Sequence, residues 1–151
     1  MSDSSFSLSA LLAQARKEGW ALPHFNFCTL DQLHAIVEAS QEESAPVMVG
    51  TAEKERRFFG AEEASTLVRI FRKRGVAVFL NADHCRSVDS AIAALKAGYD
   101  SVHIDLSKES FEKNLKGTRE VVEFAKAHAP TAHIEGELGY LVTDSSRVYK
   151  E

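Results

Sequence analysis

The chain has 151 residues, 44% hydrophobic and 26% charged, which is the composition of an ordinary globular domain. Its 18 basic and 22 acidic residues give a net charge of −4, which argues against nucleic acid as a partner. The sequence shows neither an apolar run of the ~20 residues that span a membrane nor a signal-peptide pattern. We therefore expect a cytoplasmic protein without a disulfide framework, since Cys28 and Cys85 are its two cysteines.

Helical and extended patterns alternate along the chain. Apolar residues at helical spacing predict the helices, and Thr29 with Gln32 has the pattern of a capping box where one of them begins. In chain order the predicted elements are helix 7–19, strand 20–27, helix 29–44, strand 46–51, helix 60–75, strand 76–83, helix 87–98, strand 100–107, helix 110–129 and strand 131–139. All belong to one domain, residues 1–151, with 53–59 predicted as a loop and 140–151 as a mobile loop.

This order of elements predicts an α/β fold with a parallel sheet, because strands that alternate with helices form parallel sheets. The sheet can close into a (β/α)8 TIM barrel or stay open and doubly wound. No Gly-rich phosphate fingerprint follows strand 20–27, where a dinucleotide-binding domain would carry one. Several strands end in polar groups instead, which is typical of TIM barrels, so the sequence favours the barrel.

A complete barrel has eight strands and takes about 250 residues. We therefore expect an incomplete segment of about five strands with their helices, which would leave two open sheet edges. Either the native polypeptide is longer, or another chain supplies the missing strands, or the five strands flatten into an open sheet.

Polar side chains share one face of the last three predicted strands. The residues expected to point into the barrel are Asn81, Asp83, Ser101, His103, Asp105, Ser107, His133, Glu135 and Glu137. Barrel interiors are normally apolar, and buried carboxylates are costly unless they are paired, hydrogen-bonded or bound to a metal. These carboxylates and imidazoles, together with His84, suit zinc. The alternative is a hydrogen-bonded network without a metal.

Three motifs follow successive strands in the order FLNADHC, SVHIDLS and IEGELG. Together they resemble the class II, zinc-dependent fructose-bisphosphate aldolases, and the resemblance covers the N-terminal five-eighths of that family's barrel. It implies a lyase of glycolysis and carbohydrate metabolism. The expected reaction is the zinc-dependent aldol cleavage of fructose 1,6-bisphosphate to dihydroxyacetone phosphate and glyceraldehyde 3-phosphate, and its reverse.

The resemblance also implies roles for single residues. His84 would be a zinc ligand, with Asp105 and Glu137 binding or tuning the metal in alternative positions. Asp83 would be the general acid/base at the oxygen of the reacting bond, and Asn26 would lie near the substrate. The expected partners are a phosphorylated sugar and, since the family typically forms dimers, a second copy in a homodimer or homo-oligomer.

Three other functions stay open from the sequence: a tagatose-bisphosphate or related sugar-phosphate aldolase, a catalytically incomplete barrel segment, and an isomerase-like barrel without metal. Some residues also have two interpretations. His103 and His133 either support the site or are hydrogen-bonded core residues. Cys85 is a soft metal ligand or a buried small residue, and Arg56 with Arg57 binds phosphate or lies in a solvated loop.

Overall fold

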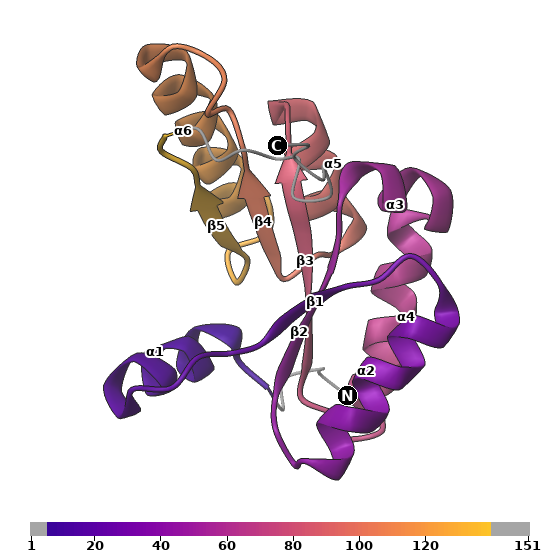
Figure 1. Cartoon of the computed structure of the whole chain (residues 1–151). Coiled ribbons are helices and arrows are strands. Elements are labelled where there is room, and N and C mark those ends of the chain that lie inside the picture. Colours follow the sequence, from indigo (N-terminus) through magenta and orange to yellow (C-terminus); the bar gives the residue numbers. More distant parts are fainter. Residues whose placement is uncertain (1–5, 140–151) are drawn as a thin grey trace, which may run out of the picture.

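The computed structural model of the chain describes residues 6–139, in which strands and helices alternate (Figure 1). The strands are β1 (His24–Asn26), β2 (Val47–Thr51), β3 (Val78–Cys85), β4 (Ser101–Ile104) and β5 (His133–Gly136). The helices are α1 (Leu8–Glu18), α2 (Leu30–Glu42), α3 (Glu53–Phe59), α4 (Ala61–Lys73), α5 (Val88–Ala97) and α6 (Phe111–His128). The loop predicted over 140–151 lies outside the described residues. In the range 6–139, no helix has the length and apolar character of a membrane span.

Every predicted helix and strand is present in the described residues, and α3 is the element that the sequence prediction missed. The segment predicted as a loop forms a helix with Glu53 and Glu55 in its first turn and Arg56 and Arg57 in its last, which suits the helix dipole. Gly60 ends it with φ of 95°. Its seven residues are too few to show a helical repeat of apolar positions.

The five strands form one parallel sheet in the order β1-β2-β3-β4-β5. A doubly wound sheet would reverse its strand order at one point, where helices switch from one face to the other. This order does not reverse, and α2, α4, α5 and α6 each pack against a strand of the same sheet. The fold is therefore a five-stranded part of a (β/α)8 barrel, as predicted.

The hydrophobic core lies between the sheet and these helices. Alternate strand residues such as Val49, Leu80 and Ile104 face it and are completely or almost completely buried. They pack with helix residues that include Val68 and Val121. The remaining strand residues point to the opposite face, called the inner face below, because successive side chains of a strand alternate.

Helix α1 is set apart from the other helices (Figure 1). It follows the cap Ser7, whose side chain accepts a hydrogen bond from the backbone N–H of Ala10. Its Ser9 Oγ lies 2.8 Å from Nε2 of His133, an inner-face residue of β5. This contact connects α1 to the amino end of the last strand and gives His133 a structural partner away from the acidic cluster described below.

Both edges of the sheet are open in the described residues, since β1 pairs with β2 alone and β5 with β4 alone. Phe25 on β1 is 52% exposed, and Leu138 just beyond β5 is 77% exposed. A groove of about 450 Å³ beside β1 is lined by Phe25, Ile36, Pro46 and other mostly apolar residues. These edges are where the sequence predicted that the barrel is incomplete.

Candidate metal and acid–base site

The site begins at an irregularity near the end of β3. Pairing with β4 is regular up to Ala82 and Val102, then shifts so that Cys85 pairs with Ile104. Within this bulge His84 has φ of +45°, a left-handed conformation that is unusual for a residue with a side chain. In a regular strand Asp83 and His84 would point to opposite faces. The bulge lets both consecutive side chains turn toward the same inner-face cluster.

His84 lies among three carboxylates. Its Nδ1 is 2.9 Å from Oδ2 of Asp105 and 3.4 Å from Oε2 of Glu137. Its Nε2 is 3.9 Å from Oδ1 of Asp83. One imidazole thus faces acids with both ring nitrogens.

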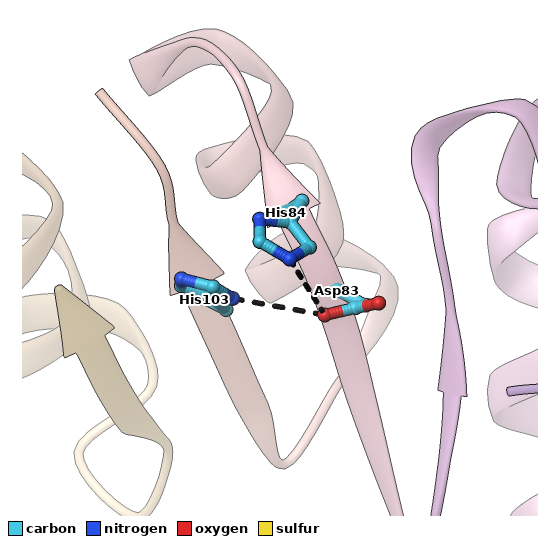
Figure 2. A group of neighbouring side chains, drawn as sticks. All are labelled: Asp83, His84 and His103. Atoms are coloured by element: carbon cyan, nitrogen blue, oxygen red, sulfur yellow. Dashed lines mark ion pairs between the residues drawn. The ribbon is translucent and has the colours of Figure 1, made fainter. Parts of the chain in front are cut away.

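His103, on β4, stands beside His84, with the two ring centroids 4.3 Å apart. Its Nδ1 is 3.6 Å from Oδ1 of Asp83, and its Nε2 is 3.0 Å from Oε2 of Glu137. Burial lowers the pKa of His103, but the hydrogen bond to Asp83 and the charges of Glu135 and Glu137 outweigh it, so the pKa is raised. Figure 2 shows both imidazoles with Asp83. His103 therefore belongs to the cluster by its contacts.

Asp83 also contacts β1, on the side away from the two histidines. Asn26 Nδ2 donates a 2.8 Å hydrogen bond to Oδ2 of Asp83. Burial alone would raise the pKa of Asp83, but the hydrogen bonds from His103 and Asn26 and the nearby histidine charges lower it to about 2. Asp83 is therefore a carboxylate at neutral pH.

Asp105 comes directly after β4 and is held in place by its neighbours. Its Oδ1 accepts hydrogen bonds from the backbone N–H and the hydroxyl of Ser107, at 3.1 and 2.6 Å. Burial would raise the pKa of Asp105, but these bonds and the contact with His84 lower it. The Oδ2 atom is left to face His84.

Glu137 follows β5 and is 9% exposed. Asn114 Nδ2 donates a 2.7 Å hydrogen bond to its backbone carbonyl, which fixes the chain at this point. Neither side-chain oxygen has an aligned hydrogen bond, although Oε2 lies close to both histidines. A buried carboxylate without such bonds is costly unless a cation joins it.

These donors fit a zinc ion. Two groups have ligand atoms that all lie within 4.8 Å of one another: Asp83 with His84 and His103, and His84 with Asp105 and Glu137. Imidazole nitrogens and carboxylate oxygens are ligands that zinc accepts. The two oxygens of Glu137 that lack hydrogen bonds support the same assignment.

Arg56 is structural, which corrects the prediction of a solvated loop. It is 8% exposed. Its guanidinium donates to the backbone carbonyls of Thr51 and Asp83 and lies 3.2 Å from Sγ of Cys85. It thereby connects the carboxyl ends of β2 and β3. The helix α3 that carries Arg56 was the missed element, so the sequence offered no signal for this role.

Cys85 is a core residue. It is completely buried with the apolar cluster, and burial raises the pKa of its thiol to about 11. It appears in neither of the two groups of candidate metal ligands. Of the two interpretations, the buried small residue is the one that fits.

A parallel sheet in sequential order, with ionisable groups gathered at the carboxyl ends of its strands, is a part of a (β/α)8 barrel with a candidate site at the face where such barrels carry theirs. The family model of class II fructose-bisphosphate aldolase matches residues 6–151, and the chain belongs to this family. It corresponds to the N-terminal part of the family's domain.

Relatives support the assignment. The chain is 37% identical to fructose-bisphosphate aldolase of Helicobacter pylori over 134 residues, which are 87% of this chain and 43% of the relative. It is 36% identical to fructose-bisphosphate aldolase of Thermus caldophilus, with coverages of 87% and 42%. The crystal structure of the YdjI aldolase from Escherichia coli K12 superposes with a TM-score of 0.79 at 27% identity, covering 92% of this chain and 54% of that one. The chain thus spans about half the length of the relatives it matches.

Proposed function

We propose that this chain carries the acid–base residue and part of the metal centre of a zinc-dependent aldolase. The proposed reaction is the reversible cleavage of fructose 1,6-bisphosphate to dihydroxyacetone phosphate and glyceraldehyde 3-phosphate. The observation that carries the proposal is the position of Asp83. This ionised carboxylate is fixed by Asn26 and lies directly beside the cluster of His84, Asp105 and Glu137.

His84, Asp105 and Glu137 would hold the zinc ion in this proposal. Bound zinc supplies an electrophile that polarises the ketose carbonyl and stabilises the negative charge that develops there. The Ser107 hydrogen bonds to Oδ1 of Asp105 leave its Oδ2 directed at His84. Hydrogen bonds of this kind orient the ligands of a metal site.

Asp83 would move the proton. In the cleavage direction, its carboxylate accepts the proton from the hydroxyl group of the departing aldehyde, and in condensation it returns that proton. A pKa of about 2 keeps this group deprotonated at neutral pH, which is the form that a proton acceptor needs. Asn26 would orient Asp83 and lie near the substrate, because its amide donates to one oxygen of that carboxylate.

The second candidate is the same reaction on tagatose bisphosphate or another phosphorylated ketose. The proposed metal and acid–base chemistry would be the same for the carbon–carbon bond that these ketoses share. The same proposal includes a cytoplasmic homodimer or homo-oligomer, since a second copy could cover the exposed Phe25 at the β1 edge.

The test is zinc-dependent cleavage of fructose 1,6-bisphosphate and of tagatose 1,6-bisphosphate by the purified chain, with EDTA-treated protein and His84→Ala as controls. Aldolase activity that both controls abolish would support the proposal. Asp83→Asn should lower kcat by roughly 10²–10⁴-fold, the usual contribution of a general acid or base. Activity that survives both EDTA and His84→Ala would contradict the proposed metal dependence. Wild-type activity no higher than that of His84→Ala would make the chain a segment that does not catalyse alone.

A further inference from the structure

Arg56 is a buried cation that the proposed function does not use. It is 8% exposed, and within residues 6–139 it forms no ion pair with a carboxylate. Burying a charge costs free energy, and hydrogen bonds from the guanidinium to its acceptors must offset that cost. The position of these acceptors therefore indicates what Arg56 does.

The acceptors of Arg56 lie on two strands and surround His84. From α3, which packs against β2 and β3, its Nη1 donates hydrogen bonds to the backbone carbonyl of Thr51 and, at 3.3 Å, to that of Asp83. Its Nη2 lies 3.2 Å from Sγ of Cys85. Asp83 and Cys85 are the sequence neighbours of His84. Arg56 thus holds β3 on both sides of His84 and connects it to the end of β2.

The sheet itself leaves this part of β3 without a partner. Pairing of β3 with β2 ends at Ala82. Pairing with β4 omits Asp83 and His84 and resumes at Cys85. Strand pairing sets the face to which each side chain of a sheet points, but neither neighbouring strand pairs with these two residues. The hydrogen bonds of Arg56 act at this unpaired position.

We propose that Arg56 is a positioning residue of the site: by holding the backbone of β3 around His84, it fixes the directions in which the side chains of Asp83 and His84 point. Among the described residues, none of its hydrogen bonds reaches a side-chain atom of the acidic cluster. This inference rests on the proposed function and deepens it, because it adds a residue that controls the geometry of the acid–base group. Lysine could not replace it fully, since one ammonium nitrogen cannot reproduce two guanidinium nitrogens that serve three acceptors in fixed directions.

Arg57 provides a matched control on the same helix. It is exposed, and its Nε donates a 3.4 Å hydrogen bond to the backbone carbonyl of Glu53 within α3 itself. Arg57→Met therefore removes the same charge from the same helix as Arg56→Met, without removing the hydrogen bonds that hold β2 and β3.

The first test reads the orientation of Asp83 in the folded protein by NMR spectroscopy. Asn26 Nδ2 donates to Oδ2 of Asp83, so the resonances of the Asn26 side-chain amide report where that carboxylate points. Arg56→Met should move these resonances toward their values in Asp83→Ala, in which the hydrogen bond is absent. Arg57→Met should keep the wild-type values. Wild-type resonances in folded Arg56→Met would overturn the inference.

Arg56→Lys keeps the test decisive if Arg56→Met does not fold. It retains the charge and most of the apolar side chain, but its ammonium can make only part of the hydrogen bonds of the guanidinium. The Asn26 amide resonances of this variant should lie between those of the wild type and those of Asp83→Ala. Resonances equal to those of the wild type would again overturn the inference. Circular dichroism of each variant identifies which of the compared proteins are folded.

Kinetics separate this inference from the proposed function. If the chain cleaves fructose 1,6-bisphosphate, Arg56→Lys should lower kcat by roughly 10-fold or more with little change in KM, because a misplaced carboxylate affects the chemical step more than substrate binding. An unchanged kcat in that variant would contradict the positioning role and leave the activity standing. Shifted Asn26 resonances in a chain that cleaves neither ketose bisphosphate would leave the positioning of Asp83 standing and contradict the proposed activity.

Discussion

The side chains on the two faces of the sheet have different kinds of contact. On the face covered by helices, residues such as Val49, Leu80 and Ile104 are buried against apolar neighbours. On the inner face, Asp83, His103 and other ionisable residues contact one another. Packing satisfies the first face within the chain itself. The inner face carries ionisable groups that could bind a cation and a substrate. The covered face therefore mainly stabilises the fold, and the inner face carries the candidate site.

The largest change in unfolding free energy is expected from a substitution that creates a cavity on the covered face. Ile104 is completely buried, so Ile104→Ala should lower the free energy of unfolding by about 2–5 kcal/mol. Urea unfolding of the EDTA-treated protein measures this loss. The control is Leu138→Ala, a similar truncation at a residue that is 77% exposed, for which a change within about 0.5 kcal/mol is expected. Equal losses in the two variants would show that burial of Ile104 does not stabilise the covered face.

A smaller effect should come from the charge of Asp83 on the inner face. Its folded pKa, about 2, is below the ordinary 3.8, so its contribution to stability is present above about pH 4 and is lost as the pH falls through 2. The difference corresponds to about 2 kcal/mol. Urea unfolding of metal-free wild type and Asp83→Asn between pH 6 and pH 2, roughly the window of this titration, should show the wild-type advantage disappearing. An advantage that does not change with pH would show that Asp83 is not stabilised as an anion.

The smallest effect is expected at Gly50, where the inner face is crowded. A Cβ atom at this position would meet Nε2 of His24 and Oδ1 of Asn26, which are ends of side chains that can move. Gly50→Ala should therefore cost only about 1 kcal/mol of unfolding free energy, the low end for overpacking. It should also displace Asn26 from Asp83 and reduce kcat, while zinc affinity stays at the wild-type value. Unchanged kcat would mean that the Asn26–Asp83 hydrogen bond does not position the carboxylate.

Much of the cluster could be predicted from local sequence. Period-two alternation placed His103, Asp105 and Glu137 on one face, and the structure brings them together with Asp83 and His84. The same rule could not explain how two consecutive residues, Asp83 and His84, reach one cluster. That outcome depends on the bulge in β3 and on the positive φ of His84, which result from pairing with β4.

Alternating apolar patterns, caps and strand-end polar residues determined the order of elements and the parallel α/β class, because these features act within a few residues of the chain. Only the tertiary structure decided which ring nitrogen of each histidine faces which acid, and that Arg56 lies buried across the ends of β2 and β3. These contacts join residues that are distant in sequence. Their geometry depends on strand register and on side-chain rotamers, which no local pattern specifies.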